Sequence, residues 1–275
     1  MLRNRSLVGY CGQLALAGGL LASCSENRPG SRPPLPEEIP RFETIGGGKS
    51  VIGLELSPAK QGRNVDAFKI TKHPITVKHY RQCVSAGACD APALSSPECR
   101  AVTDPSHLNG STFNVQAADD LPVTCVKPEQ AIEYCRWVGS KLPDSSQWLV
   151  AARGPEVRRY AWGNTLSECE QHPEARLSRR MCDVSSTDRI RVGAHSASAS
   201  PTGIEDVLLT PAELVATSAD AFFSACSKGA SACLVKGLNP GAIDGFGPIE
   251  SSEGVKAEAI PANPVYGFRC ASETK

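Results

Sequence analysis

The chain has 275 residues, enough for one large domain or two small ones and for a sizeable buried core. Its 29 basic and 29 acidic residues balance to a formal charge of zero. No long basic run is present, so the composition argues against nucleic acid as an electrostatic partner.

Residues 1–23 are predicted to be a signal peptide and not part of the fold. Two arginines precede an apolar stretch, residues 7–21, that is too short and too rich in glycine for a membrane span. The stretch ends in Leu-Ala-Ser-Cys, which resembles a bacterial lipobox whose cysteine, Cys24, is lipidated and becomes the new N-terminus. An ordinary signal peptide with an incidental Cys24 is the alternative. Ser25, where aspartate would favour the inner membrane, points to the outer membrane of the cell envelope.

Residues 24–40 follow as the lipidated cysteine and an extended tether, because the segment after Cys24 holds five prolines and no apolar periodicity. One domain is expected over residues 41–275. Its first clear elements are a strand containing Phe68 and Ile70 and a helix over residues 77–86 with Thr76 as N-cap. The helix should bury Val77, Tyr80 and Val84. His73 and His79 are not at metal-ligand spacing with other histidines, so both are expected to be surface or structural residues.

The most informative stretch is residues 121–164. Pro128 suits the first turn of a helix, and the apolar residues that follow have the spacing of a buried helical face: Ala131, Tyr134, Cys135 and Val138. Gly139 suits a left-handed helix end. Asp144 predicts the N-cap of a second short helix, with Gln147 in a capping-box position and Gly154-Pro155 as its end.

Twelve cysteines are many for this length. Ten remain after Cys11 is removed with the signal peptide and Cys24 is lipidated, and an even number in an exported protein suggests disulfides. Zinc is not expected at these cysteines because no C-x-x-C pair is present. Local spacing suggests four pairs: Cys226–Cys233, Cys169–Cys182, Cys83–Cys89 and Cys99–Cys125.

The stretch 121–164 also resembles the signature of the formylglycine-generating-enzyme, or sulfatase-modifying-factor, family, in which a helix ends in Tyr-Cys-x-Trp-x-Gly and is followed by Leu-Pro, Ala-Ala-Arg-Gly and Trp-Gly-Asn. The matches include Tyr134, Cys135, Trp137, Gly139, Leu142, Pro143, Trp148, Ala151, Ala152, Arg153, Gly154, Trp162, Gly163 and Asn164. The resemblance extends from Arg41 to a closing Gly-Phe-Arg-Cys-Ala at residues 267–271.

This resemblance implies the sulfatase-modifying-factor type of C-type-lectin-like fold. Such a fold is one α+β domain, loop-rich and disulfide-stapled, with a few short helices and twisted antiparallel sheets. The resemblance also implies a disulfide between Cys135 and Cys270.

Two departures from the family pattern concern metals. Active relatives bind calcium at a turn that contains Gly-Asn-Val and a glutamate; here Glu213 is kept, but Thr210 is a poorer ligand than asparagine and Pro211 changes the backbone. Calcium at Glu213 and Thr210 therefore stays an alternative, and no other cofactor is expected. The oxidase members also need a copper-binding cysteine pair after a strand that corresponds to residues 235–239, and no cysteine lies between Cys233 and Cys270.

From these departures we expect a non-catalytic binding or structural module, a pseudoenzyme, which the predicted lipidation of Cys24 would anchor to the membrane. Its expected partners are the lipid membrane and an unidentified protein or glycan ligand. The alternatives are a copper- and O2-dependent formylglycine-generating oxidase and a related non-haem iron oxidase, which would need histidines spaced for iron. Candidate ligand contacts are the loops after Trp162 and at residues 239–253. Arg153 and Trp162 could line such a groove, although a buried structural role is the simpler interpretation of both.

Overall fold

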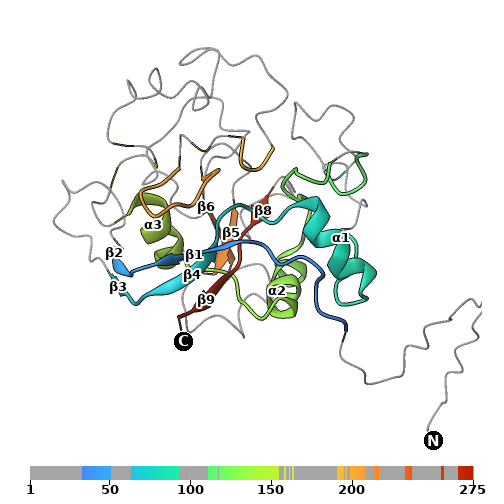
Figure 1. The fold of residues 1–275 in the computed structure, drawn as a ribbon, viewed down its shortest axis with the longest axis horizontal. Helices are drawn as coiled ribbons and strands as arrows, with labels where there is room; N and C mark the ends of the chain where they lie inside the picture. Colours follow the sequence, from blue (N-terminus) through green and yellow to red (C-terminus); the bar gives the residue numbers. More distant parts are fainter. Residues whose placement is uncertain are drawn as a thin grey trace, which may run out of the picture. The chain divides into compact units, whose positions relative to one another are not determined.

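The computed structural model describes the chain in segments: residues 33–50, 63–92, 99, 111–116, 118–154, 158, 161, 163, 191–194, 196, 199–207, 213–216, 233–236, 255–256 and 266–274. The described segments form an α+β arrangement of short strands and three helices, α1 to α3 (Figure 1). This is the fold class that the sequence predicts.

The described strands form three small sheets (Figure 1). In the first, β4 (Phe68–Thr71) lies between β1 (Phe42–Ile45) and β9 (Ala271–Glu273), antiparallel to both. The second pairs β2 (Gly48–Ser50) with β3 (Arg63–Val65). The third has the order β7 (Val255–Lys256), β6 (Cys233–Lys236), β5 (Glu213–Ala216) and β8 (Gly267–Phe268). One pair in it, β5 with β8, is parallel, so the expectation of antiparallel sheets was wrong there.

The three helices begin where the sequence predicts. In α1 (Val77–Ser85), the Thr76 side chain accepts from the His79 backbone N–H, as an N-cap does. Pro128 opens α2 (Pro128–Trp137), and Gly139 follows it with a positive φ of 75°. In α3 (Ser145–Arg153), Asp144 and Gln147 form the predicted capping box.

The core consists of two clusters of buried side chains. One joins α1 and α2 to β8 through an aromatic group in which Tyr80 stacks on Tyr134 and both meet the Phe268 ring edge-on. The other contains Trp148 of α3 together with Phe68 and Ile70 of β4 and Val215 of β5. Within these clusters Val77 and Tyr80 are buried as predicted, and Val84 is partly buried.

The last part of the segment expected to be a tether, residues 33–40, lies on the domain. The indole N–H of Trp137 donates to the carbonyl of Pro34 at 2.8 Å, and Glu38 forms an ion pair with Lys78 of α1. The compact unit accordingly starts at Pro33 and not at Arg41. Apolar periodicity could not predict this segment because backbone and charged groups make the contacts.

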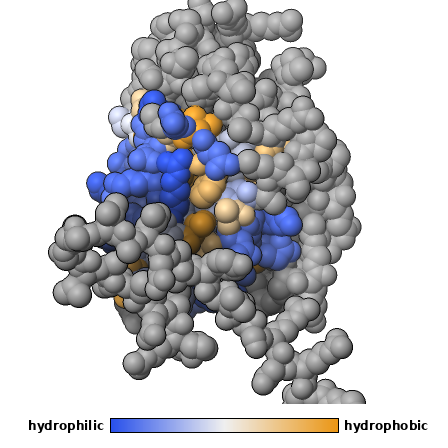
Figure 2. Space-filling view, turned by 90° about the vertical axis from the view of Figure 1, so that its right-hand side faces the viewer, coloured by the Kyte–Doolittle hydropathy of each residue, from blue (hydrophilic) through white to orange (hydrophobic). Residues whose placement is uncertain are grey.

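Most of the described surface on the side shown in Figure 2 is hydrophilic, with a narrow apolar band across it. Leu35 and Ile39, in the segment before β1, are the large apolar side chains that stand exposed among the described residues. None of the described helices has the length and apolar character that a membrane crossing requires.

Candidate functional site

A buried ion pair lies where β5, β8 and α3 meet. The Arg269 guanidinium donates through Nε to both carboxylate oxygens of Glu213, at 2.8 and 2.9 Å. The Trp148 indole N–H donates to Glu213 Oε2 at 2.8 Å. All three side chains are essentially inaccessible to solvent. Burial raises the pKa of the Glu213 carboxyl, while Arg269 and Trp148 oppose that rise by stabilising the charged form.

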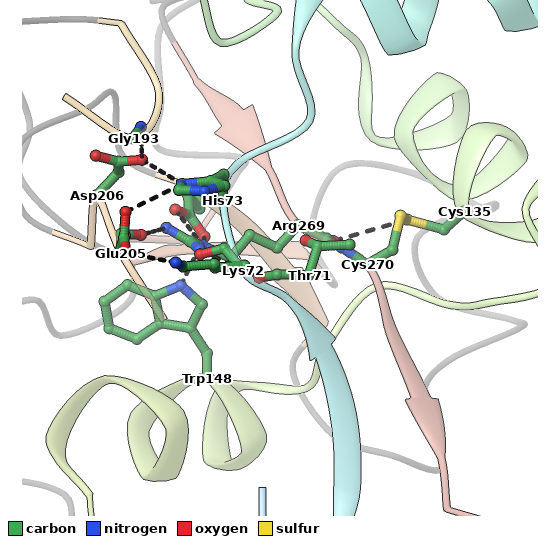
Figure 3. A network of polar contacts seen from close by, with 11 residues as sticks. Thr71, Lys72, His73, Cys135, Trp148, Gly193, Glu205, Asp206, Arg269 and Cys270 are labelled. Carbon is green, nitrogen blue, oxygen red and sulfur yellow. Dashed lines mark hydrogen bonds and ion pairs between the residues drawn. A yellow bond between two sulfur atoms is a disulfide. The ribbon is translucent and has the colours of Figure 1, made fainter. Parts of the chain in front are cut away.

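The other guanidinium nitrogens of Arg269 bind backbone carbonyls. Nη1 donates to Thr71 at 3.2 Å and to Lys72, and Nη2 donates to Glu205. Figure 3 shows the guanidinium between the end of β4 and the segment that carries Glu205. One side chain therefore ties the end of β4, together with Glu205 and Glu213, to the last part of the chain.

Above this pair lies a second polar group with partial access to solvent, formed by His73, Glu205 and Asp206 (Figure 3). Asp206 Oδ2 accepts from His73 Nδ1 at 2.8 Å and from the Gly193 backbone N–H at 2.8 Å. Glu205 Oε2 lies 3.8 Å from His73 Nδ1, and its Oε1 lies 2.6 Å from Lys72 Nζ. Asp206 is fully buried and Glu205 nearly so, whereas about a quarter of the His73 side chain (26%) is exposed.

The backbone holds this group in place from both sides. Glu205 N–H donates to the Lys72 carbonyl at 2.9 Å, which fixes the segment next to the end of β4. Asp206 has a φ of 62°, a left-handed conformation that is uncommon for residues other than glycine and that clusters at functional sites. Gly193, in the separate segment 191–194, has a φ of 76° and donates its N–H to Asp206.

Two of the suggested cysteine pairs are disulfides in the structure. Cys135–Cys270 joins α2 to the end of β8, as the resemblance implied, and Cys83–Cys89 closes the end of α1, as local spacing suggested. The suggested Cys99–Cys125 bridge is absent: both stay as buried thiols, with a hydrogen bond between them. Burial, with that hydrogen bond, raises the pKa of the Cys125 thiol. Cys169, Cys182, Cys226 and the side chain of Cys233 lie outside what the structure describes.

The residues expected at the calcium turn have separate outcomes. Thr210 lies outside the described residues, so the turn itself stays a prediction. Glu213 is described, and both its oxygens accept from Arg269 and Trp148. We therefore assign the Glu213 carboxylate to the buried ion pair with Arg269, and calcium binding at Glu213 stays a prediction.

The expected ligand groove is only partly described. Arg153 is buried, and its Nε donates to the Arg158 carbonyl at 2.6 Å, which agrees with the structural role considered above. Trp162 and residues 239–253 lie outside the described residues, as does Cys24.

The contact of His73 with Glu205 and Asp206 is not predicted by the spacing of the histidines. The two carboxylates lie more than 130 residues from His73 in the sequence. The sequence signal that could have indicated this contact is the adjacent Glu205-Asp206 pair in a segment that resembles the family pattern.

The sequence profile of the FGE-sulfatase family, described as a sulfatase-modifying factor enzyme 1-like domain, matches residues 29–274. Among curated relatives, the formylglycine-generating enzyme of Bos taurus is 36% identical over 67 residues, which cover 24% of this chain and 18% of that enzyme. The hercynine oxygenase of Mycolicibacterium smegmatis is 26% identical over 189 residues, or 60% of this chain and 42% of the oxygenase. The inactive C-alpha-formylglycine-generating enzyme 2 of Mus musculus is 25% identical over 158 residues, or 46% of this chain and 51% of that protein.

Solved structures show the same fold. CarF aligns over 86% of this chain and 99% of its own, with a TM-score of 0.52 and 16% identity. PvdO from Pseudomonas aeruginosa aligns over 86% of this chain and 95% of its own, with a TM-score of 0.54 and 13% identity. The alignments with the three curated relatives span 18% to 51% of the lengths of those proteins, so the relatives do not by themselves assign an activity to this chain.

Proposed function

Because the chain belongs to the sulfatase-modifying factor enzyme 1-like domain family, we propose that it is a lipid-anchored, non-catalytic member of that family. In this proposal, acylated Cys24 holds the protein in the outer membrane of a bacterial cell envelope. The domain binds a protein or glycan ligand, and the loops after residue 162 and at residues 239–253 are the candidate contact surface.

The observation that carries the non-catalytic part is the absence of any cysteine between Cys233 and Cys270 in the sequence. Copper chemistry of the formylglycine-generating type needs a pair of thiolates there, because soft sulfur ligands hold Cu(I). Cys270 cannot supply one of them, since it is buried in a disulfide with Cys135. Formation of an aldehyde on a sulfatase-type peptide would contradict this part of the proposal.

Two further observations support the same reading. The glutamate of the family's calcium turn, Glu213, accepts hydrogen bonds from Arg269 and Trp148 in the buried ion pair. One aligned relative carries the word inactive in its name, so loss of activity has a precedent among similar proteins. The oxygenase relative supports the iron-oxidase alternative, but the five histidines of this chain, at positions 73, 79, 107, 172 and 195, form no H-x-x-x-H-type pair that would favour it.

The anchor is tested by replacing Cys24 with serine. We expect the wild-type protein to sediment with membranes and to incorporate a labelled fatty acid, and the Cys24→Ser protein to lose the label and appear in the soluble fraction. Cys11→Ser is the matched control, because Cys11 lies in the predicted signal peptide and its loss should change neither result. A Cys24→Ser protein that keeps the label and stays with the membrane would show that the anchor is elsewhere.

A further inference from the structure

We propose that His73, Glu205 and Asp206 bind a divalent cation of the zinc type through His73 Nδ1, Glu205 Oε2 and Asp206 Oδ2. Each of the three residues has a possible ligand atom within 4.8 Å of a possible ligand atom of the other two. The proposal does not depend on the lipid-anchored binding function: it concerns a different part of the chain and a different kind of ligand.

The spacing of the ligand atoms fits one shared ion. Imidazole nitrogen and carboxylate oxygen lie about 2.0–2.2 Å from zinc, so neighbouring ligand atoms of one tetrahedral ion are separated by roughly 3.4 Å. Here, Nδ1 lies 2.8 Å from Asp206 Oδ2 and 3.8 Å from Glu205 Oε2. Side-chain movements of well under an ångström would bring both distances to the required value.

The two carboxylates keep their other contacts when they bind the ion. Glu205 uses Oε1 for Lys72 and directs Oε2 toward His73, so the ion pair and the metal bond employ different oxygens. Asp206 Oδ2 accepts from Gly193 N–H and has a second lone pair for the metal, because a carboxylate oxygen can accept more than one partner. Lys72 then serves as a neighbouring positive charge that offsets part of the negative charge of the pair.

The ligands are also held by their surroundings, as metal ligands need to be. The Gly193 N–H orients the Asp206 carboxylate, and Arg269 and Lys72 fix the Glu205 backbone on both sides of its side chain. Both carboxylates are shielded from water, whereas His73 is partly exposed. This leaves one side of the group open for a water molecule or an external ligand as the fourth partner of the ion.

The ligand chemistry selects the class of metal. One imidazole with two carboxylates suits zinc and similar first-row divalent ions, whereas calcium needs six to eight oxygens and Cu(I) needs soft sulfur. Zinc has no redox chemistry, so its binding here would not turn the domain into an oxidase.

When a metal ion binds, it takes the place of the hydrogen on His73 Nδ1. Because the Asp206 carboxylate can only accept, His73 Nδ1 carries the hydrogen in the contact between them. On binding, the metal takes the lone pair at Nδ1. The proton moves to Nε2 if the imidazole was neutral and is released to solvent if it was doubly protonated.

The test is a titration of the purified protein, without a histidine tag, with Zn2+ by calorimetry and with Co2+ by visible absorption. We expect saturable one-to-one binding of zinc and cobalt absorption bands that show a nitrogen and oxygen ligand set. His73→Gln and Glu205→Gln should each weaken zinc binding at least about tenfold. Because His73 is partly exposed, its replacement should leave the thermal unfolding temperature close to that of the wild type.

His79→Gln is the matched control. It removes an imidazole six residues away, whose Nδ1 contacts the Thr76 hydroxyl of α1 and no carboxylate of this group, and it should leave zinc affinity unchanged. Absence of saturable binding by the wild type would overturn the proposal. Equal affinities of the wild type and His73→Gln would also overturn it, because zinc would then be bound elsewhere. Calcium binding that survives His73→Gln would replace it with a site made of oxygen ligands alone.

Discussion

Replacing Arg269 by methionine is expected to lower the free energy of unfolding by about 3–5 kcal/mol, or to prevent folding altogether. Methionine keeps much of the side-chain volume but leaves the Glu213 carboxylate buried without its cation. It also removes the donors to the carbonyls of Thr71, Lys72 and Glu205. Urea denaturation, followed by far-ultraviolet circular dichroism, measures the change.

The control is Arg41→Met, which breaks an exposed ion pair of similar length with Glu43. Exposed pairs contribute roughly 0–1 kcal/mol, so this variant should unfold close to the wild type. The double variant Arg269→Met with Glu213→Gln should recover part of the loss, because it removes the buried charge and keeps an amide oxygen for Trp148. If Arg269→Met and Arg41→Met lower the free energy of unfolding by equally small amounts, the Arg269–Glu213 pair does not stabilise the fold as proposed.

Loss of the Cys135–Cys270 disulfide is expected to destabilise the domain more than loss of Cys83–Cys89. The first bridge joins residues 135 apart in sequence and the second joins residues 6 apart. In the chain-entropy account, cross-links of these lengths contribute about 5 and about 2 kcal/mol. The measurement is the free energy of unfolding of two double alanine variants, one for each bridge.

The two variants control for each other, because each replaces two buried or nearly buried cysteines by alanine and leaves similar small cavities. A larger effect from the Cys83–Cys89 variant would mean that local strain or packing, and not loop closure, sets the contribution of these bridges. It would also mean that the Cys135–Cys270 bridge is not the main stabilising link between α2 and the last strands.

The helix positions could be predicted because the residues that start and end them lie close in sequence. Thr76 caps α1, and Asp144 with Gln147 caps α3, by contacts over three residues. The Cys135–Cys270 bridge was predictable only through the family resemblance, since nothing local relates two cysteines so far apart. Cys99 and Cys125 show the limit of spacing arguments, because the two thiols are joined by a hydrogen bond and not by a disulfide.

The contacts that define the candidate site were not predictable from the sequence. Glu213 remains at the place of a calcium ligand, but its role depends on Arg269 and Trp148, which lie 56 and 65 residues away. His73 meets Asp206 at a separation of 133 residues. Such contacts depend on the order of the strands and on the left-handed backbone at Asp206, which no local pattern specifies.

The stretch 121–164 is therefore best understood as part of a scaffold. Its helix α2 is tied to the end of β8 by Cys135–Cys270, and its helix α3 supplies Trp148 to the buried ion pair. These roles are structural, which explains how the stretch can keep its resemblance to the family while the chain lacks the cysteine pair of the oxidase members.

The most direct test of the non-catalytic reading is an assay of aldehyde formation. The purified protein, loaded with copper and supplied with O2 and a thiol reductant, is incubated with a sulfatase-type peptide that contains the target cysteine. Mass spectrometry then follows conversion of that cysteine to formylglycine, with a catalytically active formylglycine-generating enzyme as positive control. We predict no conversion above that of the peptide alone with copper. Conversion of the peptide cysteine to formylglycine by the wild-type protein, lost after heat denaturation, would contradict the account. The protein would then be a formylglycine-generating oxidase.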